Sequence, residues 1–202
     1  MAESPYFERD IPLLGFLKAD QLDNNNFLSL KKNISKEYER KCLQDHGYIV
    51  KINEIKNIED TKYSLPVQKE LLEPVIHVGI IASCRICLPM KGMSIIGQII
   101  NTNKRLIYFT NGPIKGIISL DRINKKNFKN IRDIIRYEKT VDGNKVLASL
   151  QQNDYIKIII EQIKYNDGKD NMIVLASLDS MATQKEIEMF QKDELLLPSV
   201  SK

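Results

Sequence analysis

The chain is poor in the residue types on which most catalytic and metal sites depend. Its 202 residues include 3 cysteines and 2 histidines. Cys42, Cys84 and Cys87 are an odd number without the spacing of a disulfide framework, which is typical of a reducing compartment. His46 and His77 have no Ser, Cys or carboxylate at a spacing that indicates a catalytic triad.

Longer signals are missing as well. No apolar run approaches the roughly 18 residues of a membrane span, and Met1–Asp10 has no apolar signal core. We therefore expect an intracellular protein without a membrane partner. The sequence also has no phosphate loop and no Gly-x-Gly-x-x-Gly. We expect no catalytic residue of its own, no metal and no cofactor.

One cysteine pair leaves an alternative open. Cys84 and Cys87 lie three residues apart in a predicted strand, which places their sulfurs on opposite faces. They cannot share a metal or form a disulfide without breaking the strand, and no second pair completes a zinc site. A cysteine-based redox enzyme would require both thiols to react together.

Positive charge is concentrated in one segment. Residues 91–145 contain 12 basic and 4 acidic side chains, a net charge of +8, whereas residues 1–90 carry −1 and residues 146–202 carry −3. A general lysine bias would spread these residues evenly. Such asymmetry favours a polyanionic partner.

The first half predicts a helix and antiparallel strands. Residues 1–22 read as irregular, although Tyr6, Phe7, Ile11 and Leu13 could supply a short edge strand. Residues 27–43 repeat apolar side chains every three or four positions and predict a helix. Residues 48–58 predict a strand, and strict alternation over 75–88, between Pro74 and Pro89, predicts a longer one.

The second half predicts a barrel. Strand patterns cover about 93–101, 105–110, 114–119, 154–164 and 171–178, with turn signals between them. Residues 124–137 keep helical spacing through Phe128, Ile131, Ile134 and Ile135. Three strands, a helix and a closing hairpin make a five-stranded OB-fold. Residues 181–192 predict a short helix, followed by a tail.

A candidate surface for single-stranded RNA follows from this barrel. OB barrels bind single strands with basic side chains that follow the phosphates and aromatic rings that stack on bases. The candidate RNA-binding residues are Lys104, Arg105, Tyr108, Lys115, Arg122, Lys125, Lys126 and Lys129.

The order of these motifs resembles the stalk subunit of multisubunit RNA polymerases, the family of the seventh subunit of eukaryotic RNA polymerase II and of its archaeal counterpart. In that family a helix ends in a basic segment and Gly-Tyr-Ile, as Cys42–Ile49 does here. A long strand then closes with Leu88-Pro89-Met90-Lys91-Gly92. The barrel opens with a pattern similar to Gly92–Ile99, and a Gly-Pro turn matches Gly112-Pro113. The resemblance covers roughly residues 5–178.

The resemblance implies a non-catalytic subunit. It implies that a tip domain docks on the large polymerase core subunits through the segment around His46, Gly47, Tyr48 and Ile49. It also implies that the OB domain contacts nascent RNA and that a small helical stalk partner can accompany the subunit. Residues 124–145 and the segment after Leu178 have no clear family counterpart.

We therefore expect an α+β protein with three parts: an α/β tip domain of helix plus antiparallel strands over 1–90, an OB-fold RNA-binding domain over 91–180, and a short helix and tail over 181–202. The expected role is support of transcription initiation. The expected location is the nucleus or, for a large DNA virus, the cytoplasmic virus factory and virion. The alternative is a free-standing OB-type RNA-binding protein acting in translation or RNA metabolism.

Overall fold

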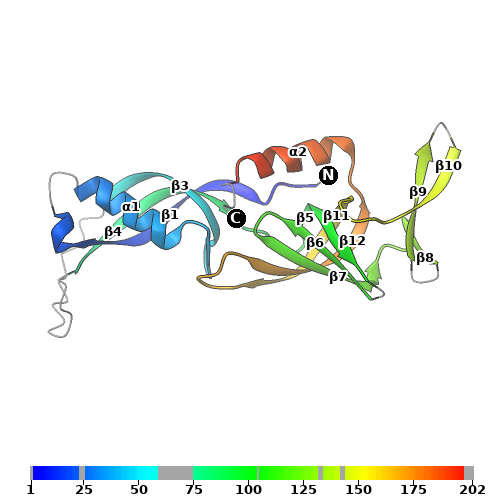
Figure 1. Ribbon diagram of the computed structural model, residues 1–202, viewed down its shortest axis with the longest axis horizontal. Coiled ribbons are helices and arrows are strands. Elements are labelled where there is room, and N and C mark those ends of the chain that lie inside the picture. The colour runs from blue at the N-terminus through cyan, green and yellow to red at the C-terminus, as the bar shows by residue number, and fades with distance from the viewer. Residues whose placement is uncertain are drawn as a thin grey trace. The chain divides into compact units, whose positions relative to one another are not determined.

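Strands dominate the chain and are arranged in two units. The computed structural model describes residues 2–22, 26–58, 75–103, 105–131, 134–141 and 144–197. We call residues 6–87 with 167–169 the sheet unit, and the remaining residues, 1–5, 88–166 and 170–202, the barrel unit. In Figure 1 the colour of the elements follows the chain, from blue at the N-terminus to red at the C-terminus.

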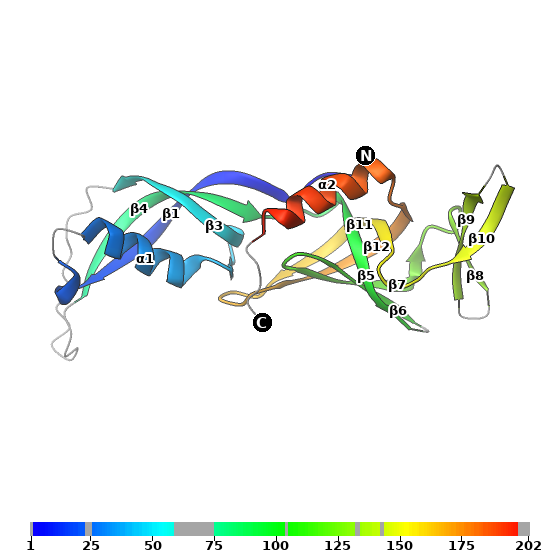
Figure 2. The same ribbon diagram turned by 45° about the horizontal axis from the view of Figure 1, so that its top comes forward.

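The sheet unit is a four-stranded antiparallel sheet with one helix on it. The strand order is β1-β4-β3-β2, and Figure 2 shows α1 lying along the sheet. Leu30 and Ile34 of α1 are buried, and both approach Gly15 of β1, where any side chain would collide with them. The elements are β1 (Tyr6–Lys18), α1 (Asn26–Tyr38), β2 (Lys41–Leu43), β3 (Gly47–Ile58) and β4 (Val75–Cys87), with a short 3-10 turn, η1 (Ala19–Gln21), after β1.

The two predicted strands of this half are confirmed as β3 and β4. The N-terminal segment forms the edge strand that it could supply, but the strand is long rather than short: β1 has 13 residues and pairs with β4 along its whole length. Pro12 is tolerated because β1 is an edge strand. The helix ends at Tyr38 rather than at residue 43: Arg40 adopts a left-handed φ of 63°, and its amide donates to Ile49 O at 2.7 Å.

The barrel unit contains the predicted five-stranded barrel. Its closed order is β11-β12-β7-β6-β5, in which β12 pairs with β7 in parallel and the other pairs are antiparallel. Phe109 fills the interior and is fully buried. The strands are β5 (Ser94–Thr102), β6 (Leu106–Asn111), β7 (Ile114–Ile123), β11 (Tyr155–Tyr165) and β12 (Met172–Met181).

Between β7 and β11 the predicted helix is wrong. The segment instead forms a three-stranded antiparallel sheet of β8 (Phe128–Ile131), β9 (Ile134–Val141) and β10 (Asn144–Ser149). Phe128 pairs with Tyr137 across β8 and β9. Isoleucine is β-branched and favours strands over helices. The alternation of apolar and polar side chains along Ile135, Arg136 and Tyr137 also fits the strand β9. Figure 1 shows this small sheet beyond one end of the barrel.

The helix α2 (Gln184–Leu195) packs on the barrel and holds the N-terminal segment of the same unit. Phe190 is buried with Ala2 and Ile96, and its ring meets Tyr155 edge-on at 5.4 Å between centroids. The Ala2 amide donates to Glu186 Oε1 at 2.8 Å. Across the described ranges, neither helix has the length and apolar character needed to span a bilayer.

Candidate nucleic-acid interface

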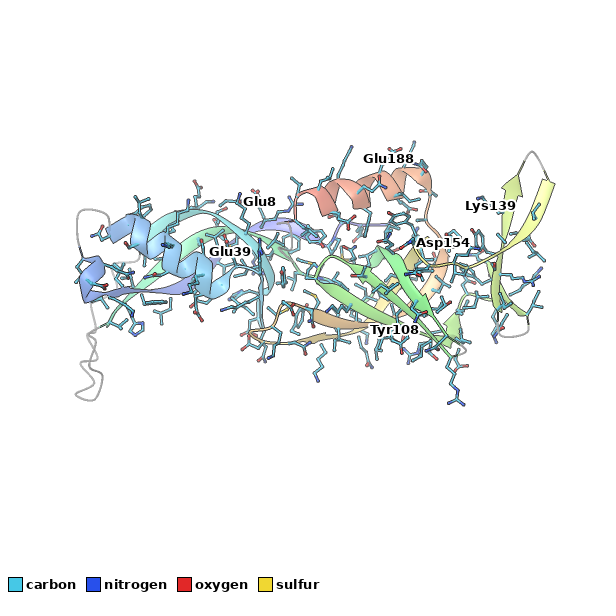
Figure 3. The ribbon with its side chains drawn as sticks, viewed as in Figure 1. Glu8, Glu39, Tyr108, Lys139, Asp154 and Glu188 are labelled. Atoms are coloured by element: carbon cyan, nitrogen blue, oxygen red, sulfur yellow. The ribbon has the colours of Figure 1, made fainter. Side chains whose placement is uncertain are left out.

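The outer face of β6 and β7 carries part of the predicted surface. Tyr108 lies on β6 opposite Ile117 and is partly exposed (Figure 3). Lys115 lies opposite Thr110 on the same outward face and is exposed. Arg105, between β5 and β6, is also exposed. The predicted Lys104 lies outside the described residues.

Arg122 is less available than the sequence indicated. It lies near the end of β7, where its guanidinium forms an ion pair with Glu161 of β11. The carboxylate neutralises the arginine charge and uses part of its five N–H donors, so the arginine attracts a phosphate less strongly. Arg122 is therefore a weaker candidate than the lysines that follow it.

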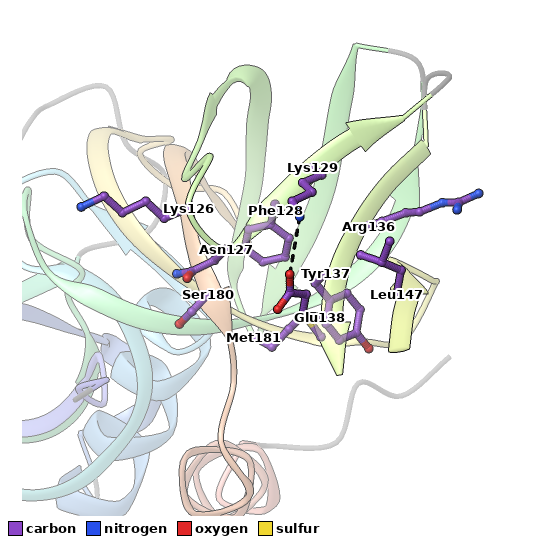
Figure 4. A pocket seen from close by; sticks show the side chains of 10 residues that line it. All are labelled: Lys126, Asn127, Phe128, Lys129, Arg136, Tyr137, Glu138, Leu147, Ser180 and Met181. Atoms are coloured by element: carbon purple, nitrogen blue, oxygen red, sulfur yellow. Dashed lines mark hydrogen bonds and ion pairs between the residues drawn. The ribbon is translucent and has the colours of Figure 1, made fainter. Parts of the chain in front are cut away.

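The structure brings Lys125, Lys126 and Lys129 together where the barrel meets the three-stranded sheet. All three are exposed, and they border two grooves on either side of the buried Phe128. The first groove has a volume of about 260 Å³ and the second about 340 Å³. Figure 4 shows the first groove, which lies between β8, β9 and the end of β12. We call it the Tyr137 groove; its lining residues are Lys126, Asn127, Phe128, Lys129, Arg136, Tyr137, Glu138, Leu147, Ser180 and Met181.

Tyr137 was not anticipated as a site residue. Its ring packs edge-on against Phe128, with 6.3 Å between ring centroids and 60° between planes. Burial, with a smaller effect of Asp154, raises the pKa of the Tyr137 hydroxyl, so the phenol is neutral near pH 7. The sequence signal that would have identified the surrounding strands is Asp142-Gly143, a dipeptide typical of hairpin turns.

Asn127 was also missed, and Arg136, which belongs to the predicted basic segment, was expected on a helix rather than on a strand. Arg136 pairs directly with Lys129 across β9 and β8, which places two cations opposite each other. Asn127 Nδ2 donates to Asp179 O at 2.8 Å, which anchors the loop before β8 to β12. The Lys129–Arg136 pairing depends on the strands β8 and β9, which a helical assignment of 124–137 hides.

The predicted docking segment forms the turn between β2 and β3. Gly47 adopts φ +80°, a left-handed conformation that glycine accepts without a steric penalty. Tyr48 and Ile49 are 9% and 0% exposed. Both side chains therefore pack into the core of the sheet unit and provide no exposed apolar surface at the turn. The exposed residues of the turn are Gln44 and Asp45, with His46 partly covered.

The sequence is similar to that of a protein of Acanthamoeba polyphaga mimivirus. The two are 27% identical over 195 residues, which cover 96% of this chain and 92% of the mimivirus protein. The mimivirus protein bears the provisional name of a DNA-directed RNA polymerase subunit. No protein-family model matches the chain.

The cysteines are poorly suited to redox chemistry. Cys42, Cys84 and Cys87 are all buried and free of disulfides. Burial, with smaller effects of Glu39 and Asp10, raises the pKa of the Cys84 thiol to about 11, and the reactive species of cysteine is the thiolate. Within the described part of the chain, no three His, Cys, Asp or Glu side chains gather as a metal site would require.

Proposed function

We propose that this chain is a non-catalytic subunit of a DNA-directed RNA polymerase. The observation that carries the proposal is similarity over nearly the whole length to the mimivirus protein. A short shared motif would be compatible with many functions, whereas similarity over 96% of the chain includes both units. The barrel with its basic segment is a further support, because a polymerase subunit works beside nucleic acid.

Within such a polymerase, we propose the role of a stalk subunit. Residues 1–90 would dock on the large core subunits through the β2–β3 turn, with or without a small helical partner. Residues 91–180 would contact nascent single-stranded RNA. Tyr48 and Ile49 are buried, so they would act by shaping this turn. Gln44 and Asp45 would make the contact.

Association with a polymerase is tested by purification of the tagged chain from its native source, followed by mass spectrometry. We expect large polymerase subunits in near-stoichiometric amounts, and a small stalk partner would appear in the same sample. RNA or ribosomal proteins without polymerase subunits would contradict the proposal.

The electrostatic part of the proposal is tested by charge reversal. Replacing Lys125, Lys126 and Lys129 by glutamate should weaken binding of single-stranded RNA with little sequence preference. The dependence of log K on log salt should become shallower by about 0.7 for each phosphate that the variant no longer binds. The matched control reverses Lys31, Lys32 and Lys36, which are exposed on α1 of the sheet unit. Equal weakening in both triple variants would mean that net charge, rather than this surface, binds RNA.

Burial of Tyr48 and Ile49 also favours a second candidate function. A free-standing RNA-binding protein has no need for an exposed apolar tip, and these two side chains provide none. That protein would bind RNA through the same barrel unit and act in translation or RNA metabolism. The purification experiment separates the two candidates, because only the polymerase subunit brings the core with it.

A further inference from the structure

We propose that the Tyr137 groove is a binding site for one nucleotide of single-stranded RNA. The base would lie against the Tyr137 ring, and the flanking phosphates would bind Lys126 and Lys129. The inference rests on the proposed RNA contact of the barrel unit and deepens it, because it replaces a diffuse basic surface with a discrete site on the small sheet.

The size and lining of the groove suit a base. Its volume of about 260 Å³ is just below the roughly 300–1,000 Å³ of pockets that hold drug-sized ligands. Phe128 and Met181 provide apolar wall, and Phe128 holds the Tyr137 ring edge-on at 6.3 Å. A ring fixed by a second ring loses little freedom when a base stacks on it, and stacking on an aromatic side chain tolerates any base.

The charges around the groove suit phosphate. Lys126, Lys129 and Arg136 line it together with one carboxylate, Glu138. Lys129 and Arg136 are cross-strand neighbours, and like charges placed opposite each other destabilise a sheet. A phosphate bound at Lys129 would relieve that repulsion. Glu138 relieves the repulsion only in part. Its Oε1 lies 3.5 Å from Lys129 Nζ, and both side chains are more than 45% exposed. Such surface ion pairs contribute little.

Two polar side chains also line the groove and could bind a base edge. Asn127 uses its Nδ2 donor on Asp179 O at 2.8 Å, which fixes the amide and leaves Oδ1 as an acceptor beside the groove. Ser180, from the end of β12, adds a hydroxyl to the same wall (Figure 4). These groups come from the loop before β8 and from the barrel. The site therefore requires both the inserted sheet and the barrel.

The first test uses the absence of tryptophan. The chain contains no Trp, so Tyr137→Trp places a single indole in the groove. Titration with a short oligouridylate should quench its fluorescence with the same midpoint as the anisotropy change of a fluorescein-labelled copy of that RNA. Binding seen by anisotropy without any change in indole fluorescence would overturn the groove site and leave the proposed RNA contact intact. A chain that binds no RNA by either signal would overturn both.

The second test separates stacking from charge. Tyr137→Leu, which keeps an apolar side chain, should weaken RNA binding about tenfold, within the range of one base–aromatic stack, and leave the salt slope unchanged. Tyr137→Phe, which keeps the ring, should bind as the parent does. Thermal unfolding identifies loss of fold in either variant. The matched control is Tyr38→Leu, a partly exposed tyrosine of the sheet unit. Unchanged affinity of a folded Tyr137→Leu would contradict the inference.

Discussion

Phe109 determines which residues can occupy two neighbouring positions of the barrel. A Cβ at Gly116 would lie 1.8 Å from Phe109 Cζ, and a Cβ at Gly97 would lie 2.6 Å from Cδ2. Both distances are far below van der Waals contact. The aromatic ring therefore occupies the space that a side chain would need on β5 and on β7. At these positions glycine is required for packing rather than for backbone freedom.

Gly116→Ala should destabilise the barrel unit by about 1–3 kcal/mol through overpacking. Alanine also lowers the conformational entropy of the unfolded chain, which stabilises the fold by only about 0.4–1 kcal/mol. The steric cost should therefore exceed this gain. Urea unfolding measures the difference. In a Phe109→Leu background the cost of Gly116→Ala should shrink, because the clashing ring is gone. An undiminished cost in the double-mutant cycle would contradict this explanation.

Glu186 is a buried carboxylate whose charged form is stabilised by several hydrogen-bond donors. Burial raises its pKa, but hydrogen bonds from the Thr183 amide, the Ala2 amide and the Thr183 hydroxyl outweigh burial, together with the charge of Lys157. Its pKa falls from 4.5 to about 2. The Thr183 amide donates at 3.0 Å, so the pair also begins α2 as a capping box does.

Because the folded pKa of Glu186 lies below the unfolded value, its contribution to stability is complete above pH 4.5 and is lost as pH falls towards about 2. Glu186→Gln should lower the free energy of unfolding near pH 7 by roughly 1–3 kcal/mol and flatten its dependence on pH over that window. Chemical unfolding at a series of pH values tests this. Glu188→Gln, at an exposed position of the same helix (Figure 3), should change neither quantity.

At the scale of elements, α1 contributes to the core of the sheet unit through a narrow apolar stripe. Ile34 is 1% exposed, whereas Leu28 on the same helix is 64% exposed. Ile34→Ala should therefore destabilise the sheet unit by about 2–5 kcal/mol, and Leu28→Ala should cost no more than about 0.5 kcal/mol. Hydrogen exchange of the β1 and β3 amides reports the loss in this unit separately from the barrel. Equal effects of the two substitutions would show that α1 does not bury this stripe in solution.

The elements also show how far the sequence could predict the fold. Alternation over 75–88 predicted β4 because one face of that strand is buried, from Val78 to Ile86, whereas the other face is mostly only partly covered. The barrel strands were predicted because each is bounded by Gly, Pro or Asn turns. The prediction for residues 124–137 failed because Phe128, Ile131, Ile134 and Ile135 satisfy a helical period by coincidence, whereas β8 has only 4 residues in which to show a strand pattern.

The candidate site was predicted only in part for the same reason. Lys125, Lys126 and Lys129 were found from charge density, which does not depend on conformation. Tyr137 was not found, and neither was the position of Arg136 opposite Lys129, because both depend on strand pairing. The buried state of Tyr48 and Ile49 was likewise hidden, since the sequence does not show which apolar residues of a turn face the core.

At the scale of the whole molecule, the two units should be separable in function. Asp45 is exposed in the β2–β3 turn, so Asp45→Lys should reduce co-purification of polymerase subunits while leaving RNA affinity of the isolated chain unchanged. Asp20→Lys, at another exposed acid of the same unit, is the control. Loss of RNA affinity in Asp45→Lys would contradict this division, as would equal loss of co-purification in both variants.

The bond between the Ala2 amide and Glu186 joins positions 184 residues apart. During synthesis the chain emerges from the ribosome in order, so Ala2 is made long before its partner. Strands β1 to β4, all within residues 6–87, can pair while translation continues. The segment before β1 can pack only after α2 has been made. Translation therefore imposes an order of assembly in which the segment around Ala2 reaches its final position after the strands that follow it.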